Sequence, residues 1–366
     1  MPLKKNTSLE YKDTQLLIAF KAHFKGFLNL HRVRAICMII NAICKVRSVN
    51  FSLLSSGFDN NVHSSSNFRR LQRFFADAKI PMELVSKLIF SLLPNKESLV
   101  LVMDRTNWKF GQNNINILML GVCYKNVAFP LIFKMLDKRG NSNTKERIEL
   151  MDSYIKWFGI NTIDCLLCDR EFIGKDWLNY LNINGIKYHI RIRNNFKVFI
   201  PKKQKEVTAW HLFNSLPVGG SKHYEKIVKL NEEYCYISCM KTIKDGKLEY
   251  CILVSFNKPE ESMDKYKERW QIETLFRGLK TSGFNLEDTH VTHKDRLEKL
   301  LLMVMIAFVW CYKLGDFIDA NFKKIKIKKH GNREISVFKL GLDYLTRVII
   351  SNVNLFKINV YDFIVV

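Results

Sequence analysis

The spacing of hydrophobic and polar positions changes along the chain and divides it into regions of different structure. Residues 1–96 have the periodicity of helices: dense apolar positions at 20–46 predict one helix, and residues 68–75 predict another. The Ser-rich segment 64–67 offers N-caps to the second helix. The apolar run 98–103 consists of β-formers without a helical period, which is typical of a strand covered on both faces. We therefore expect a helical N-terminal region followed by a sheet.

Strand and helix patterns alternate in the next hundred residues. They are strands at 116–124 and 127–135, a helix at 143–158 capped by Asn143 or Thr144, a second buried strand at 161–168, a helix at 175–182 and a strand at 187–193. Buried strands that alternate with helices predict a sheet flanked by helices, and hence an α/β fold class.

The pattern changes again after residue 195. Alternating apolar positions, Val-Gly-Gly at 218–220 and the turn 244–247 predict a β-rich insertion at 196–257. A helix at 266–280 and an apolar helix at 297–314 follow, and residues 321–366 form a basic C-terminal region. The apolar run 300–312 is too short to span a bilayer, so we interpret it as a buried helix.

The charge of the chain indicates a polyanionic partner. Its 366 residues carry 58 Lys and Arg against 35 Asp and Glu, a formal net charge of +23. Such an excess favours nucleic acid first and an anionic membrane surface second. Arg69, Arg70 and Arg73 on the predicted helix 68–75 are candidates to enter a DNA groove, with a solvated basic face as the alternative. Nine cysteines in apolar contexts indicate reduced thiols in a cytosol rather than disulfides or a zinc site.

Three carboxylates stand at positions suited to phosphoryl transfer. Asp104 follows the buried strand 98–103, Asp169 follows the buried strand 161–168, and Glu273 lies on the helix 266–280. Grouped carboxylates resist ionisation unless divalent cations neutralise them, and two such cations catalyse in-line displacement at phosphorus. A single Asp at a strand end is more often a turn former or a helix cap. The repetition of the pattern on a basic chain favours the metal site formed by Asp104, Asp169 and Glu273.

The helix 266–280 presents a polar stripe beside an apolar one. Tyr266, Arg269, Glu273 and Lys280 fall within roughly 60° of one another on a helical wheel. The adjacent face, with Ile272, Leu275, Phe276 and Leu279, is expected to be buried. The alternative is an ordinary amphipathic helix with a solvated ion pair between Arg269 and Glu273.

At these residues the chain resembles the DDE transposases of bacterial insertion sequences, in the insertion sequence 4 group. That group is defined by a Tyr-x2-Arg-x3-Glu-x6-Lys signature, whose four positions correspond to Tyr266, Arg269, Glu273 and Lys280. The segment 169–172, Asp-Arg-Glu-Phe, is similar to the motif of the second aspartate, and Asp104 corresponds to the first. The resemblance spans about residues 65–315.

The resemblance implies a ribonuclease-H-like mixed sheet at 97–195 and 258–320, interrupted by the β-rich insertion. It implies a cytoplasmic, nucleoid-associated enzyme, without a membrane partner, that binds its element's inverted repeats, cleaves both strands and joins 3′-hydroxyls to target DNA. It also implies that the enzyme uses two Mg²⁺ ions, for which Mn²⁺ can substitute. It further implies that the enzyme acts as a dimer in a synaptic complex. Tyr266, Arg269 and Lys280 would hold phosphates. Trp210 would stack on a flipped base, with a core tryptophan as the alternative.

Two other functions suit the same sequence. The first is a catalytically silent DNA-binding repressor of the element, which the positive charge and the helical N-terminal region also suit. The second is a nuclease of the same fold without strand transfer. An intact set of three carboxylates favours an enzyme over the repressor, and the signature favours a transposase over the nuclease.

Overall fold

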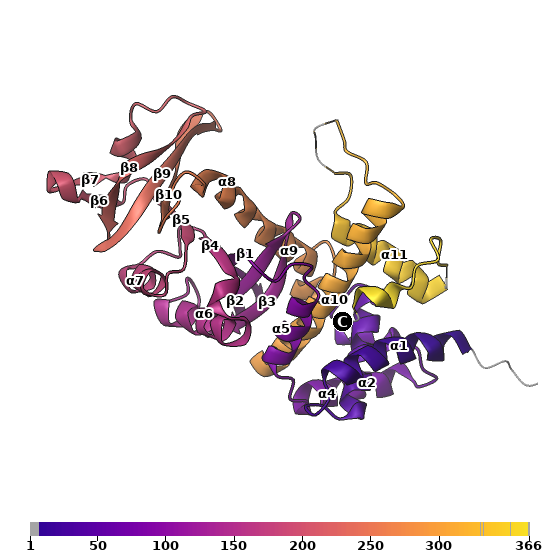
Figure 1. The fold of residues 1–366 in the computed structure, drawn as a ribbon. Helices are drawn as coiled ribbons and strands as arrows, with labels where there is room; N and C mark the ends of the chain where they lie inside the picture. The colour runs from indigo at the N-terminus through magenta and orange to yellow at the C-terminus, as the bar shows by residue number, and fades with distance from the viewer. Residues whose placement is uncertain (1–6, 330, 332, 352, 365–366) are drawn as a thin grey trace, which may run out of the picture. The chain divides into compact units, whose positions relative to one another are not determined.

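The computed structural model describes residues 7–329, 331, 333–351 and 353–364, which fold into two compact units (Figure 1). We call residues 95–107 and 114–275 the sheet unit. Residues up to 94, 108–113 and from 276 onward form the helical unit. The chain passes more than once through each unit, so segments far apart in the sequence share one core.

A single ten-stranded sheet organises the sheet unit. Its strands lie in the order β3-β2-β1-β4-β5-β10-β9-β8-β6-β7. Their bounds are β1 Leu99–Phe110, β2 Asn113–Tyr124, β3 Val127–Met135, β4 Ile163–Cys168, β5 Tyr188–Ile192, β6 Lys197–Ile200, β7 Lys205–Thr208, β8 Ser221–Leu230, β9 Glu233–Lys244 and β10 Lys247–Ser255.

The centre of the sheet is parallel and buried. Strand β4 pairs parallel with both β1 and β5, whereas β2 pairs antiparallel with β3 and β5 antiparallel with β10. The side chains of Leu166, Leu167 and Cys168 on β4 are completely buried, as expected for a strand covered on both faces. The predicted α/β class, a mixed sheet flanked by helices, is confirmed.

The antiparallel strands after residue 195 continue the same sheet, because β10 pairs with β5 on one side and with β9 on the other. The turn predicted at 244–247 joins β9 to β10. Asp245 and Gly246 at its centre have φ values of 51° and 73°, the left-handed conformation that a two-residue hairpin loop requires.

Helices of the sheet unit pack against this sheet. They are α6 Thr144–Phe158, α7 Lys175–Ile183, α8 Ser262–Lys267 and the first turns of α9 Gln271–Lys280, with 3-10 turns η1 Ile160–Thr162, η2 Pro201–Lys203, η3 Ala209–Phe213 and η4 Glu268–Trp270. Helix α6 contacts β3 and α7. Its predicted cap is confirmed: the Asn143 side chain accepts from the Glu146 backbone N–H, and the Glu146 carboxylate accepts from that of Asn143.

The helical unit is built around α10. Its elements are α1 Thr7–His23, α2 Leu30–Val46, α3 Phe51–Ser56, α4 Ser64–Asp77, α5 Met82–Ser91, the end of α9, η5 Leu286–Asp288, α10 Lys294–Asn321, α11 Val337–Ser351 and η6 Val360–Phe363. Helix α10 packs against α2, α4, α5 and α11. Its approach to α11 is close, since a Cβ atom on Gly341 would collide with the carbonyl oxygen of Cys311.

Helix α10 contains the apolar run 300–312, and every residue of that run is buried, which confirms the predicted core helix. The helix extends well beyond the run on both sides. By length and composition it is the one helix in the described part of the chain that could cross a membrane, and 83% of its most apolar window is buried in this structure.

Two helix predictions in the N-terminal region need correction. Residues 20–46 do not form one helix: α1 ends at His23, Gly26 takes a φ of 82°, and Asn29 caps the new helix α2. The segment 64–67 is not a capping loop but the first turn of α4. Asn67 is buried there and bonds to the Asn60 side chain, so it is used for packing rather than as a cap.

Candidate active site

Asp104 and Asp169 follow the last pair of the parallel ladder between β1 and β4, Met103 with Cys168. Asp169 comes directly after the end of β4, as predicted. Asp104 does not come after the end of its strand, because β1 continues to Phe110 beside β2. One aspartate is therefore held within a strand and the other in the turn after the neighbouring strand.

Arg269 joins the first aspartate to the glutamate. Its Nη1 donates to Asp104 Oδ2 at 3.0 Å, and its Nη2 donates to Glu273 Oε1 at 2.8 Å. The Arg269 side chain is only 11% exposed, so the alternative of a solvated ion pair does not hold: Arg269 forms a half-buried bridge between two acidic residues. Asp104 and Glu273 therefore accept hydrogen bonds from the same guanidinium group.

The segment that carries the signature is not one continuous α-helix. Helix α8 ends at Lys267, the 3-10 turn η4 contains Arg269, and α9 begins at Gln271. The tighter turn changes the angles between side chains, so the 60° stripe calculated for one ideal helix does not apply. The predicted burial of Ile272, Leu275, Phe276 and Leu279 is confirmed.

Tyr266 connects the same segment to the second aspartate. Its hydroxyl donates to Asp169 Oδ1 at 3.4 Å, and the Arg269 guanidinium lies 5.7 Å from the centre of its ring. Lys280, the last residue of α9, belongs to the helical unit. There its ammonium pairs with Glu287 at 2.7 Å and lies 5.5 Å from the centre of the Trp108 ring.

The surroundings of Asp104 and Arg269 shift the pKa values of both groups. Burial raises the pKa of Asp104 from 3.8 to about 6, and the nearby charges of Glu171 and Asp169 add to the rise. The backbone N–H of Arg105, 2.7 Å from Asp104 Oδ1, and the charge of Arg269 lower that pKa in part. Burial opposes the charge of Arg269, but Tyr266, Asp104 and Glu273 outweigh it and raise the pKa of the guanidinium.

The donor set of Asp104, Asp169 and Glu273 suits a hard divalent cation such as Mg²⁺, which prefers carboxylate oxygens. The raised pKa of Asp104 identifies a carboxyl group that a nearby cation would stabilise in its charged form. Here Arg269 supplies that positive charge. Among the described residues, no three or more His, Cys, Asp or Glu side chains are arranged to hold a metal. In this structure Arg269 occupies one carboxylate oxygen of Asp104 and one of Glu273.

Two arginines fix the loop after Asp169, and one of them, Arg147, was not singled out from the sequence. Arg105 donates from Nε and Nη2 to the Glu171 carboxylate at 3.2 and 3.3 Å, and from Nη1 to Asn116 at 2.9 Å. Arg147 is 4% exposed and donates to the backbone carbonyl of Glu171 at 2.9 Å. Its guanidinium also lies over the Phe172 ring, 4.9 Å from the centre.

A sequence signal for Arg147 exists. On α6 it shares the buried stripe of Leu150, Met151 and Tyr154, at helical spacing. A charged residue on an apolar stripe is rarely buried without a partner. The pattern could therefore have indicated a buried hydrogen-bonded arginine, although not its partner.

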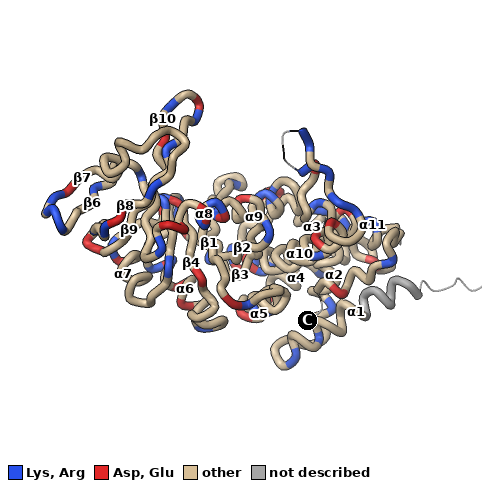
Figure 2. Tube along the Cα trace, turned by 45° about the horizontal axis from the view of Figure 1, so that its top comes forward, with Lys and Arg blue, Asp and Glu red and all other residues tan. Residues whose placement is uncertain are grey.

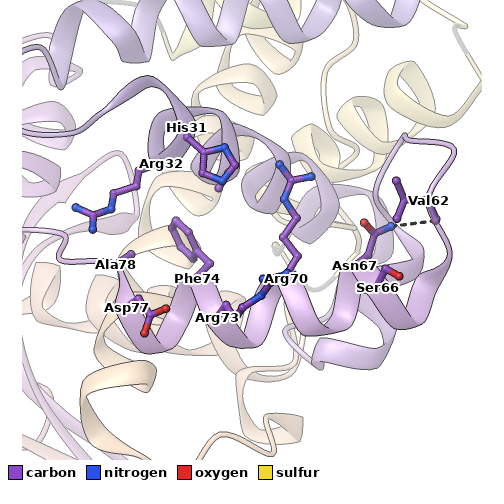
Figure 3. A pocket seen from close by; sticks show the side chains of 11 residues that line it. His31, Arg32, Val62, Ser66, Asn67, Arg70, Arg73, Phe74, Asp77 and Ala78 are labelled. Carbon is purple, nitrogen blue, oxygen red and sulfur yellow. Dashed lines mark hydrogen bonds between the residues drawn. The ribbon is translucent and has the colours of Figure 1, made fainter.

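Two of the three candidate arginines of the N-terminal region line a pocket. Arg70 and Arg73 line a pocket of about 540 Å³ between α4 and α2, together with His31 and Arg32, and Arg69 is not among its lining residues. Figure 3 shows Arg70 and Arg73 on α4 and His31 and Arg32 on α2 around this pocket.

Trp210 lies in η3, and its side chain is half-buried. Its ring packs against His211, with centroids 4.0 Å apart, and against Tyr250 at 6.1 Å. These contacts fix the ring within the antiparallel part of the sheet and leave part of it accessible.

Comparison with known proteins identifies the family. Residues 96–310, more than half of the chain, match the family described as transposase DDE domain. No curated protein matches the sequence. Among solved structures, the chain is similar to the piggyBac transposase synaptic complex with hairpin DNA, at 12% identity and a TM-score of 0.46, over 97% of this chain and 82% of that one. It is also similar to the Argonaute of Marinitoga piezophila with guide RNA, at 14% identity and a TM-score of 0.23, over 59% of this chain and 34% of that one. The match over residues 96–310, which contain Asp104, Asp169 and Glu273, shows that this chain belongs to the transposase DDE domain family.

Proposed function

We propose that this protein is a cut-and-paste DNA transposase of the insertion sequence 4 group. It binds the terminal inverted repeats of its element, cleaves the ends and joins the 3′-hydroxyls to target DNA. The observation that carries the proposal is the bridge from Asp104 through Arg269 to Glu273 beside Asp169, within the residues that match the family.

In this proposal Asp104, Asp169 and Glu273 hold two Mg²⁺ ions, which Mn²⁺ can replace. When bound, such ions activate the attacking oxygen and stabilise the leaving one. Arg269 passes from the carboxylates to a phosphate of the DNA, which its planar guanidinium can grip through two hydrogen bonds. Tyr266 and Lys280 also hold phosphates of the DNA.

The remaining DNA contacts are assigned to the N-terminal region and to the β-rich insertion. Residues 1–96 bind the element end, with Arg69, Arg70 and Arg73 as contacts, and Trp210 in the β-rich insertion at 196–257 stacks on an unpaired base. Lys and Arg occur throughout both units (Figure 2), so one DNA molecule could engage each of them. Two copies of the chain hold two ends in the synaptic complex.

The test begins with the DNA that flanks the gene. Imperfect inverted repeats there define the candidate ends. Labelled duplexes carrying one end are incubated with the wild-type protein and Mg²⁺ or Mn²⁺, beside Asp104→Asn, Asp169→Asn and Glu273→Gln variants. We expect cleavage and joining by the wild type, a loss greater than about 100-fold in each variant, and retained DNA binding in all four proteins.

Each alternative has its own outcome. Cutting without joining identifies a nuclease, and tight binding without cutting identifies a repressor. Cleavage that survives in all three variants contradicts the assignment of the carboxylates.

A further inference from the structure

A polar pocket beside Asp169 has no role in the function proposed above. It lies in the sheet unit and has a volume of about 540 Å³, within the usual range for ligand pockets. Besides Asp169, it is lined by Asn141, Arg170, Glu171, Ile173, Arg193 and Phe196. It thus combines two cations, an aromatic ring and an amide next to a proposed catalytic carboxylate and to Glu171, whose charge is paired with Arg105.

The topology of the sheet brings the two arginines together. Arg170 lies in the turn after β4, and Arg193 lies directly after β5, which pairs parallel with β4 at Cys168 and Ile190. Turns that follow neighbouring parallel strands lie at the same edge of a sheet. The turn after β5 is held by hydrogen bonds from the Phe196 backbone N–H to the Arg193 carbonyl and from the Ala209 N–H to the Phe196 carbonyl.

The two arginines differ from the other arginines near the site. Three of these pair with carboxylates. Arg105 pairs with Glu171, and Arg191 pairs with Glu249. Arg269 pairs with both Asp104 and Glu273.

Within the described residues, neither Arg170 nor Arg193 has a side-chain hydrogen bond or an ion pair, and both are exposed. Their guanidinium groups are therefore available to an anionic ligand. A phosphodiester suits them best, because guanidinium forks match phosphate oxygens and the net charge of +23 favours nucleic acid over acidic protein.

We propose that this pocket is a phosphate clamp for the DNA strand beside the scissile phosphate. Arg170 and Arg193 grip one phosphate group, and Phe196 packs against the sugar attached to it. The inference rests on the proposed function, which places the scissile phosphate at Asp104, Asp169 and Glu273. It adds two phosphate contacts that lie outside the Tyr-Arg-Glu-Lys signature.

The clamp can be tested by combining variants with neutral phosphates. Binding of an element-end duplex is measured by fluorescence anisotropy without divalent metal, using DNA in which one phosphate at a time is replaced by a methylphosphonate. We expect Arg170→Ala and Arg193→Ala each to weaken binding about tenfold. One methylphosphonate should weaken wild-type binding at least as much as either substitution does, and should have a smaller effect on either variant.

Arg139→Ala is the matched control, because Arg139 is an exposed arginine of the same unit that does not line the pocket. It removes the same charge but should leave every methylphosphonate effect as in the wild type. If all methylphosphonate effects persist unchanged in Arg170→Ala and Arg193→Ala, the clamp is refuted.

Cleavage in Mg²⁺ separates this inference from the proposed function. If the wild type cuts element ends while Arg193→Ala behaves like Arg139→Ala at every phosphate, the clamp fails and the function stands. If the wild type cuts no element end, the proposed function fails. The clamp is then tested by measuring the affinity of the variants for an unrelated duplex. Equal affinities of Arg193→Ala and Arg139→Ala would overturn the clamp, and weaker binding by Arg193→Ala alone would support it.

Discussion

Arg105 and Glu171 form a two-bonded ion pair between the two segments that carry the candidate aspartates. Arg105 directly follows Asp104, and Glu171 lies two residues after Asp169, so the pair links the two chain segments just beyond the β1–β4 ladder. Arg147 strengthens the link through its hydrogen bond to the Glu171 carbonyl. The spacing of the aspartates thus depends on side chains as well as on strand pairing.

The first prediction concerns the strength of this pair. Arg105 and Glu171 are 14% and 20% exposed, so breaking the pair leaves a half-buried charge without its partner. We expect Arg105→Gln and Glu171→Gln each to lower the free energy of unfolding by about 1–3 kcal/mol. The double variant should lose less than the sum of the two, and denaturant titrations of all four proteins give the coupling energy.

The control for this cycle is the pair between Lys258 and Glu261, whose side chains are 47% and 42% exposed. Such a solvated pair should couple by less than about 1 kcal/mol. Equal coupling in the two cycles would show that the Arg105–Glu171 pair has no special role in fixing the loop. DNA cleavage should fall in Arg105→Gln and stay unchanged when Lys258 is replaced.

The second prediction follows from the position of Arg269 between Asp104 and Glu273. Removal of the guanidinium in Arg269→Ala leaves the half-buried Asp104 carboxylate without a counter-charge, which should destabilise the free protein by about 3 kcal/mol. The same change removes the competitor for a cation. We therefore expect Mg²⁺ to raise the melting temperature of Arg269→Ala more than that of the wild type, as measured by calorimetry.

Arg191→Ala is a suitable comparison, since Arg191 pairs with Glu249 in the same unit and does not contact the three carboxylates. Its melting temperature should respond to Mg²⁺ as the wild type does. A response of Arg269→Ala no larger than that of Arg191→Ala would contradict the idea that Arg269 and a cation compete for the same oxygens.

Both candidate aspartates could be predicted from the sequence because each follows a run of apolar β-formers, and neighbouring buried strands align their ends. The continuation of β1 beyond Asp104 could not, since residues 104–110 are held by pairing with β2, a contact between segments that no local pattern records. The 3-10 turn at Arg269 was also missed, because its sequence has the same apolar periodicity as an α-helix.

The contacts between distant polar residues were the least predictable. Arg269 was expected to face a phosphate, yet in the free protein it pairs with Asp104, which lies 165 positions earlier in the chain. Arg105 and Glu171 are 66 positions apart. Which charges meet depends on the packing of strands and turns, and a single sequence gives only their types.

The third prediction concerns the pH dependence of stability through Asp104. Its pKa is about 6 in the folded protein and near 3.8 when unfolded, so the folded state binds more protons between these values. Stability from this group is therefore full below pH 3.8 and is lost as the pH rises through 6. The loss is about 3 kcal/mol. Asp104→Asn should lack this contribution, so its stability relative to the wild type should rise by that amount between pH 4 and 7.5, as unfolding titrations of both proteins measure.

An identical pH slope in Asp104→Asn and the wild type would show that Asp104 titrates as an exposed carboxylate. The variant Asp152→Asn serves as a reference. Asp152 lies on α6, accepts a hydrogen bond from the Tyr180 hydroxyl and is not one of the three candidate carboxylates. The variant's pH profile of stability should match that of the wild type.

The fourth prediction concerns His189, which acts in the opposite direction. His189 is 3% exposed on β5, and its Nδ1 lies 3.0 Å from the Ser262 hydroxyl. Burial lowers its pKa from 6.5 to about 4. The unfolded state therefore binds the additional proton first on acidification, and stability is lost as the pH falls from 6.5 to 4, by about 3 kcal/mol.

His189→Asn keeps a polar group near the position of Nδ1 and removes the titration, so its stability should fall less on acidification than that of the wild type. The imidazole signal of His189 in NMR spectra gives a direct measurement and should move only near pH 4. A midpoint near 6.5 would refute the prediction. Because Asp104 and His189 oppose each other between pH 4 and 6, the wild type should show a shallow pH profile there, and only the two variants together reveal both contributions.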